Sequence, residues 1–312
     1  AYLALGPQEL KRRAADAYER LRDCALCGRA CHVDRRAGET GSCRTGERAR
    51  VSSYFAHFGE EDCLRGWRGS GTIFFSYCNL RCQYCQNYEL SAEGQGEEVE
   101  PEDIARMMLE LQEEGCHNIN FVSPSHVVPQ ILAALAIAAQ AGLHLPLVYN
   151  TGGYDAVETL RLLDGVIDIY MPDMKYGDPA VALQYSKVPN YPAINQAAVL
   201  EMYRQVGDLV IGPDGLARRG LLVRHLVLPG GLAGTAEVMR FLARNVSRDT
   251  YVNIMSQYRP AYKAHDLPPL HRPITAEEYR TAVRLAEEAG LWRFDQRQHR
   301  EEQGWLVWLT EL

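Results

Sequence analysis

The sequence predicts an α/β fold in which a parallel sheet forms a barrel or part-barrel, and three observations predict it. Between residues 70 and 255, apolar runs typical of buried strands alternate with helical patterns in five or six successive units. The chain has 312 residues, which is enough for one barrel with an appendage. Its composition, 46% hydrophobic and 23% charged, is that of an ordinary globular protein and excludes collagen-like and broadly disordered classes.

The expected elements follow from local patterns. Apolar residues at helical spacing make Pro7–Arg22 an amphipathic helix. Pro101 suits a first helical turn, and a capping box at Thr275 begins a last helix that ends before Gly290. The strands are expected at Ser70–Tyr77, Asn118–Val122, Leu145–Tyr149, Val166–Met171, Leu221–Leu228 and Tyr251–Met255. The helices between them are expected at Pro101–Glu114, Val127–Ala141, Ala156–Leu163, Ala197–Val206 and Thr235–Arg244.

We expect three regions along the chain. Residues 1–69 form an N-terminal helix and a cysteine-rich metal-binding region, residues 70–270 form the barrel, and residues 271–312 form a C-terminal helix and an aromatic tail. The tail, Trp305–Leu312, is expected to pack on the barrel or on a partner chain rather than to anchor the protein in a membrane.

Charge and hydropathy exclude several partners. The net charge is −7 and there is no long basic run, so we expect no nucleic-acid partner and no anionic membrane surface. The longest apolar run of the least charged stretch is Ile131–Ala139, well short of the about 20 residues that a membrane span needs. The N-terminus shows no basic segment followed by an apolar core, so the expected location is the cytoplasm.

Cysteine spacing is the most informative feature, because seven of the nine cysteines fall into two tight groups. Such grouping in a cytoplasmic chain favours metal binding over disulfides. The second group, Cys78, Cys82 and Cys85, has the spacing C-x3-C-x2-C directly after an expected strand. Three thiolates suit a [4Fe–4S] cluster with one free iron, whereas a structural zinc site normally takes a fourth ligand. A zinc loop with a distant fourth ligand is the alternative.

The segment SYCNLRCQYCQN, residues 76–87, resembles the signature of radical S-adenosylmethionine (radical SAM) enzymes, with Tyr84 at the aromatic position. It is most similar to the pyruvate formate-lyase activating enzyme group, and within it to the PflX-type branch. The resemblance extends over roughly residues 24–273. It implies a partial (β/α)6 barrel in which the three cysteines bind [4Fe–4S], while the free iron chelates S-adenosylmethionine (SAM).

The resemblance also implies an activity. One-electron reduction cleaves SAM to methionine and a 5′-deoxyadenosyl radical, which abstracts hydrogen from a substrate. The implied partners are a one-electron donor such as flavodoxin or ferredoxin and, for glycyl-radical activation, a glycyl-radical protein. The ferredoxin-like insert that many such activating enzymes carry is absent, since a Gly/Glu-rich loop follows Tyr88. The alternatives are the same radical chemistry on a small molecule or peptide, and a non-catalytic metal-binding module.

Polar residues follow the expected strands, where barrel enzymes collect their binding residues. The resemblance implies that SAM contacts come from Tyr84, Asn87, Asn150, Thr151, Asp173, Lys175 and His225. The chain departs from the superfamily after the Asn118–Val122 strand, where it lacks a Gly-Gly-Glu-like motif, and there we expect Ser123, Ser125 and His126 to supply the polar contacts instead. The simpler alternatives are a helix cap for Ser125, a turn after Asn150, an ion pair between Asp173 and Lys175, and core packing for His225. Substrate contacts are expected from Asn253, Gln257, Tyr258 and Arg259.

The first cysteine group is Cys24, Cys27, Cys31 and Cys43, spaced C-x2-C-x3-C-x11-C in a polar, glycine-rich segment. Four thiolates can close a metal site, and metal binding would supply the folding free energy that the segment lacks. Zinc and an auxiliary iron–sulfur cluster are both compatible, with zinc slightly favoured by the spacing. Two cysteines remain outside the groups, Cys63 and Cys116, and both are expected to pack as small buried hydrophobes.

Overall fold

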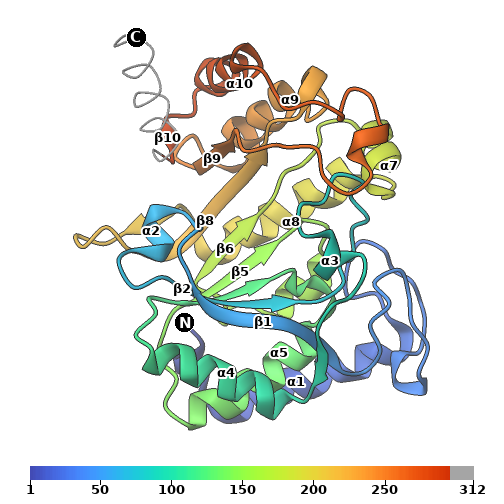
Figure 1. The fold of residues 1–312 in the computed structure, drawn as a ribbon. Coiled ribbons are helices and arrows are strands. Elements are labelled where there is room, and N and C mark those ends of the chain that lie inside the picture. Colours follow the sequence, from blue (N-terminus) through green and yellow to red (C-terminus); the bar gives the residue numbers. More distant parts are fainter. Residues whose placement is uncertain (296–312) are drawn as a thin grey trace.

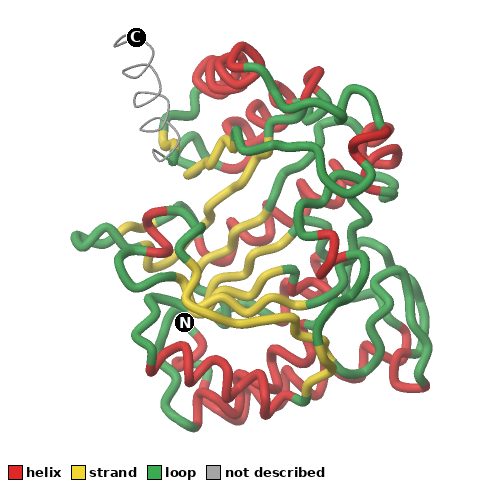
Figure 2. Tube along the Cα trace, in the orientation of Figure 1, coloured by secondary structure: helices red, strands yellow, loops and turns green. Residues whose placement is uncertain are grey.

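The structure is a computed structural model that describes residues 1–295. The aromatic tail expected at Trp305–Leu312 therefore lies outside the described residues. Within them, a mostly parallel sheet is surrounded by helices, which confirms the predicted α/β part-barrel (Figures 1 and 2).

Six parallel strands form the centre of the sheet in the part of the chain that is described. In spatial order they are β2 (Ser70–Phe75), β4 (Ile119–Val122), β5 (Leu147–Thr151), β6 (Ile169–Pro172), β8 (Ala217–Leu226) and β9 (Tyr251–Met255). The sheet continues beyond β2 through β1 (Ala49–His57) and β3 (Glu97–Val99), which pair antiparallel. At the other edge β10 (Arg293–Phe294) lies beside β9, so the sheet stays open. A short hairpin strand, β7 (Val210–Ile211), pairs with β8.

Helices pack on the outer face of the sheet (Figure 1). The larger ones are α1 (Gly6–Glu19), α4 (Pro101–Glu113), α5 (Val128–Gln140), α6 (Val157–Leu162), α8 (Tyr191–Val206), α9 (Thr235–Phe241) and α10 (Ala276–Ala289). Three shorter ones are α2 (Asp62–Arg65), α3 (Tyr88–Ser91) and α7 (Pro179–Ser186). The main hydrophobic core fills the space between helices and strands, and α1 contributes Leu10, Ala14 and Ala17 to it. Among the described residues, no helix is both long and apolar enough to cross a bilayer.

Strand register brings polar residues of neighbouring strands to one edge. Val122 of β4 lies opposite Asn150 of β5, and Thr151 lies opposite Pro172 of β6. Arg224 of β8 lies opposite Asn253 of β9. Because all these strands run in the same direction, their carboxyl ends and the loops that follow converge on one mouth, as in other barrel folds.

Candidate active site

The second cysteine group directly follows β2. Tyr77 adopts a left-handed conformation with φ of 63°, which turns the chain out of the strand immediately before Cys78. Cys78, Cys82 and Cys85 then all line one cavity of about 470 Å³. The sequence motif is therefore gathered at a single place by the turn and by the short helix α3 behind it.

Each sulfur atom of this group has a polar neighbour. The Leu80 amide donates to Cys78 Sγ at 3.4 Å, and the Ser186 hydroxyl donates to Cys82 Sγ at 2.9 Å. Cys85 Sγ lies 3.1 Å from the Ser91 hydroxyl oxygen. Burial raises the pKa of Cys78 and Cys82, and the Leu80 and Ser186 donors act in the opposite direction because they stabilise the thiolate, the form that binds metal.

Several residues predicted from the sequence share this cavity with the cysteines. They are Asn87, Ser123, Asn150, Thr151, Asp173, Lys175, Asn253 and Gln257. They come from the cysteine loop and from the ends of four parallel strands. The topology therefore brings together residues that are far apart in the sequence, such as Asn87 and Gln257, which are 170 residues apart. Gly153 comes two residues after Thr151 and has a φ of 73°. A Cβ at this position would lie 2.3 Å from the Asp173 carbonyl oxygen, so the close approach of the two loops requires glycine.

An ion pair lies in the cavity wall after β6. Lys175 Nζ is 2.5 Å from Asp173 Oδ2, and the two side chains are only 17% and 20% exposed. Burial lowers the pKa of Lys175, but Asp173, Cys82 and Tyr191 together outweigh burial and raise that pKa well above its ordinary value. The lysine is therefore a fixed cation beside a carboxylate, and together they can match a ligand that carries both charges.

Six other predicted residues do not line this cavity. Tyr84 packs edge-on against Tyr176 and Tyr258, with ring centroids 6.4 and 6.0 Å away. Tyr258 donates its hydroxyl to the Leu270 carbonyl at 2.6 Å, and Arg259 is exposed. These aromatic side chains belong to a second hydrophobic core that supports the cysteine loop from behind.

The remaining three are buried polar residues behind the cavity wall. Ser125 Oγ lies 2.9 Å from Thr151 Oγ1. His225 uses both ring nitrogens, at 2.7 Å from the Met174 carbonyl and 2.9 Å from Thr235 Oγ1. His126 instead faces a separate, smaller cavity that the first cysteine group lines.

A charged network that was not predicted from the sequence contributes Glu60, Arg224 and Asn253 to the lining of the same cavity. Arg224 of β8 makes two bonds to Glu61, at 2.7 and 2.6 Å, and a third to Glu60. Asn253 donates to Glu61 at 2.7 Å and Asn120 donates to Glu60 at 3.0 Å. Burial raises the pKa of Glu60, but the Arg224 guanidinium and His57 outweigh burial and hold that pKa below its usual range. Two carboxylates facing one guanidinium leave excess negative charge at the cavity.

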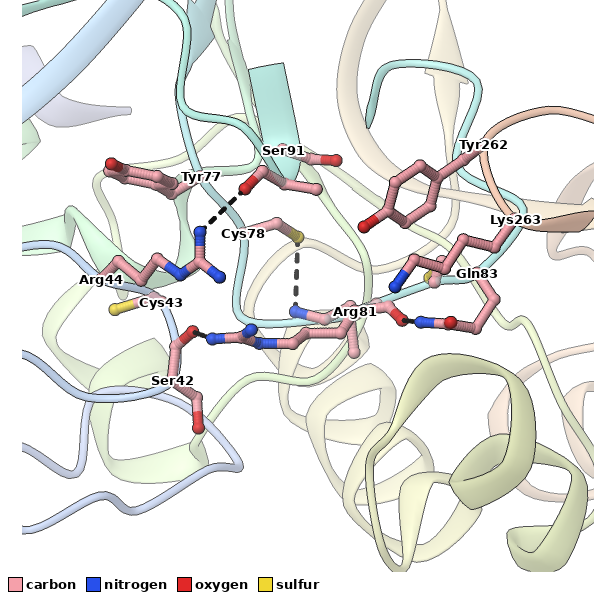
Figure 3. A pocket seen from close by; sticks show the side chains of 13 residues that line it. Ser42, Cys43, Arg44, Tyr77, Cys78, Arg81, Gln83, Ser91, Tyr262 and Lys263 are labelled. Atoms are coloured by element: carbon pink, nitrogen blue, oxygen red, sulfur yellow. Dashed lines mark hydrogen bonds between the residues drawn. The ribbon is translucent and has the colours of Figure 1, made fainter. Parts of the chain in front are cut away.

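On its outer side the cysteine loop borders a second, surface pocket of about 170 Å³ (Figure 3). Cys78 and Cys82 line it together with Cys43 of the first group. Its cationic residues are all exposed, and they are Arg44, Arg81 and Lys263. Positive charge thus gathers beside the loop on a chain whose net charge is −7.

The sequence profile of the radical SAM superfamily matches residues 72–230, which is just over half of the chain. The chain belongs to the radical SAM superfamily. Members cleave SAM reductively at a [4Fe–4S] cluster, so this cluster and SAM are the cofactors of the present protein. The matched radical SAM segment begins in β2 and ends after β8, and it contains Cys78, Cys82 and Cys85.

The chain is also similar to individual proteins and solved structures. The uncharacterized protein MJ0674 of Methanocaldococcus jannaschii is 32% identical over 278 residues, which cover 86% of this chain and 76% of that relative. A radical SAM methyltransferase from Sphaerobacter thermophilus aligns at a TM-score of 0.48 and 13% identity, over 72% of this chain and 66% of that one. SuiB from Streptococcus suis was solved with the precursor peptide SuiA. It aligns with a TM-score of 0.45 and 16% sequence identity, over 70% of this chain and 46% of SuiB. This radical SAM chain therefore spans less than two thirds of either solved protein.

The cavity residues fit both radical SAM cofactors. Three thiolates are a suitable ligand set for an iron–sulfur cluster. The volume of about 470 Å³ lies within the roughly 300–1,000 Å³ of typical small-molecule sites. Asp173 and Lys175 would hold the ammonium and carboxylate of SAM, and Ser123, Asn150 and Thr151 add hydrogen-bonding groups along the same wall.

Proposed function

We propose that this chain is a radical SAM enzyme of the pyruvate formate-lyase activating enzyme-like group that abstracts hydrogen from a substrate bound beyond the cysteines. One observation carries the proposal: a single cavity joins Cys78, Cys82 and Cys85 to the Asp173–Lys175 pair and to the charged wall at Glu60 and Arg224. Cys78, Cys82 and Cys85 would hold the cluster, which when bound and reduced would supply the electron for reductive cleavage of SAM. The chain itself orients SAM and separates the radical from bulk water.

Two substrate classes are compatible with this site. The CNLRCQYC motif resembles enzymes that activate glycyl-radical proteins, which favours a glycine Cα–H as the hydrogen source. The buried network around Arg224 favours the second class, a small molecule or peptide with its own polar or positive groups. A charged wall that stays dry stabilises a complementary ligand charge more strongly than water does.

One experiment tests the proposal and separates the classes. The protein is reconstituted anaerobically, reduced with dithionite and given SAM, and 5′-deoxyadenosine is quantified by mass spectrometry. We expect 5′-deoxyadenosine even without substrate, and its absence from cluster-loaded protein would refute the function. Addition of anaerobic extract from the source cells, followed by electron paramagnetic resonance, decides the substrate. A glycyl-radical signal supports the first class, and faster 5′-deoxyadenosine formation without that signal supports the second.

We further propose that the implied one-electron donor docks at the surface pocket formed by Arg44, Arg81 and Lys263. The pocket borders Cys78 and Cys82, so an acidic flavodoxin or ferredoxin bound there would lie close to the cluster. Charge reversal in Arg44→Glu with Lys263→Glu should slow reduction by flavodoxin and weaken its salt dependence. Reduction by a small photochemical donor should stay unchanged, and equal slowing with both donors would contradict docking at this pocket.

A further inference from the structure

The four cysteines of the first group lie together, outside the segment that the radical SAM profile matches. Cys24, Cys27, Cys31 and Cys43 all line one small cavity, and all except Cys31 are less than 9% exposed. The apolar cluster in this region is small, with Leu21, Cys24 and Leu26 as its buried members. Hydrophobic packing alone is therefore a weak explanation for the ordered conformation of this segment.

The backbone around these cysteines holds an unfavourable conformation. Ala30, His32 and Arg44 have φ values of 41°, 54° and 55°, in the left-handed region that residues with a Cβ seldom adopt. Gly41 packs so closely that a Cβ there would lie 2.7 Å from Cys31 Sγ. Strained positions of this kind persist where surrounding interactions over-determine them, and here they directly adjoin Cys31 and Cys43.

A buried cation points to negative charge at this cavity. Arg35 is 1% exposed and lines the cavity, and within residues 1–295 its side-chain hydrogen bonds go to backbone carbonyls and to a cysteine sulfur, with no carboxylate among these partners. Its guanidinium donates to the carbonyls of Gly46 and His126, and Nη1 lies 3.8 Å from Cys24 Sγ. An unpaired buried charge is costly, so the thiolates are the natural counter-charge.

Two further polar groups face this sulfur-lined cavity. The Ser42 amide donates to Cys31 Sγ at 3.4 Å. His126 also lines the cavity, is 2% exposed, and leaves its Nδ1 without a hydrogen-bond partner. Native proteins rarely leave such a group unsatisfied, so an unpaired buried nitrogen beside four cysteines indicates a missing ligand.

Four cysteine thiolates can hold either of two metal centres. In zinc sites four sulfurs surround one ion at about 2.3 Å. A [4Fe–4S] cluster instead takes one thiolate on each of its four irons. Cys24, Cys27, Cys31 and Cys43 line one common cavity, and the metal content of the protein decides between these two centres.

The two cysteine groups are also adjacent. The Tyr154 carbonyl accepts hydrogen bonds both from the Gly28 amide, next to Cys27, and from the Asn79 side chain, next to Cys78, at 3.0 and 2.8 Å. Arg29 Nε donates to the Asn79 carbonyl at 2.7 Å. A metal centre at the first group would therefore support the loop that carries the radical SAM cysteines.

We propose that Cys24, Cys27, Cys31 and Cys43 bind a second iron–sulfur cluster, a closed [4Fe–4S] centre whose negative charge Arg35 balances. Four protein thiolates leave no iron free, so this cluster takes no substrate. The inference depends on the proposed function only for the identity of the neighbouring cluster.

Metal analysis of a triple variant tests the second cluster. Cys78→Ala/Cys82→Ala/Cys85→Ala removes the radical SAM ligands and keeps the first group. Anaerobically reconstituted triple variant should retain about four irons and four sulfides per chain, against about eight of each in wild type. About one zinc and no iron, or a folded protein without metal, would overturn the proposal. If the triple variant is insoluble, the iron content of the wild-type protein decides the same question. About eight irons per chain would support the second cluster, and about four would overturn it.

Single variants locate the second cluster. Cys31→Ser and Arg35→Met should each lower wild-type iron by about half, while the radical SAM cluster still yields 5′-deoxyadenosine in soluble protein. The matched controls are Cys116→Ser, which is buried elsewhere, and Arg36→Met, the partly exposed neighbour of Arg35. Both controls should keep full iron content. Full iron in Cys31→Ser would show that the first group does not bind the second cluster.

Discussion

At the residue scale, the cavity depends on a few charged side chains whose neighbours determine what they can bind. Lysine is rare in this chain, with four lysines against 29 arginines, and Lys175 is the one inside the cavity. The presence of Lys175 in the cavity could be predicted from the resemblance and from its position after a strand. The direction in which His126 faces could not be predicted, because packing that the sequence does not show decides it.

The first prediction concerns Lys175. Lys175→Met should weaken SAM binding by about 10- to 100-fold, since a charge-assisted hydrogen bond contributes roughly 1.5–3 kcal/mol. Anaerobic calorimetry on cluster-loaded protein measures the dissociation constant. Lys11→Met, on the exposed face of α1, should bind SAM like wild type. Equal affinities of the two variants would show that Lys175 does not contact SAM.

The second prediction concerns His225 and pH. Burial lowers the pKa of His225 to about 4, against the opposing effects of the Met174 carbonyl and Asp173. The unfolded chain, with a histidine pKa near 6.5, binds the proton more readily, so stability is full above about pH 6.5 and falls as the pH drops toward 4. The loss approaches about 3 kcal/mol at the acid end of that range.

Thermal melts at about pH 7.5 and about pH 5 measure this effect. Acid also releases metal from thiolates, so wild type is compared with His225→Gln, which removes one titrating group and keeps the cysteines. The melting temperature should fall less with acid in His225→Gln than in wild type. Identical pH dependence in both proteins would contradict the assignment to His225.

At the element scale, strong periodic patterns were predictable and weakly patterned elements were not. β9 lies at Tyr251–Met255 as expected, and α10 begins at the expected Thr275 capping box. β1 (Ala49–His57) was missed because it is half-buried and mixes serine and arginine with its apolar residues. α8 begins at Tyr191, six residues before the expected start, and the proline in its first turn, a position that favours proline, was not used as a start signal.

The missed charged network follows from the missed β1. Glu60 and Glu61 lie in the loop after that strand, and no local pattern relates them to Arg224 in β8, more than 160 residues later. Only the closure of the sheet brings them together. Residues with a local motif, such as Cys78, were therefore predictable, whereas a network made by tertiary contact was not.

The third prediction concerns this network. Glu61→Ala leaves the largely buried Arg224 without its bidentate partner, and breaking a buried pair costs about 3–5 kcal/mol. Anaerobic chemical denaturation should show this loss in the free energy of unfolding. Glu158→Ala breaks an exposed pair with Arg161 and should cost less than about 1 kcal/mol. A similar small cost for Glu61→Ala would mean that water reaches the network.

At the scale of the whole molecule, the open parallel sheet places the cysteine loop and the ends of five other strands around one mouth. The fold class was predictable because strand–helix alternation leaves few topologies. The reaction depends on the residues that line this mouth. A radical reaction needs cluster ligands, SAM contacts and a substrate site that excludes water, all in one cavity.

The most direct test of this account is SAM cleavage by Cys82→Ala beside Cys116→Ala. Each variant removes one of the nine cysteines of the chain. Cys82 lines the cavity, whereas Cys116 is buried in the main core. Reduced, reconstituted protein is incubated with SAM, and 5′-deoxyadenosine is quantified. We predict that Cys116→Ala forms 5′-deoxyadenosine like wild type and that Cys82→Ala forms none above background. Formation at the wild-type rate by purified, folded Cys82→Ala would contradict the account.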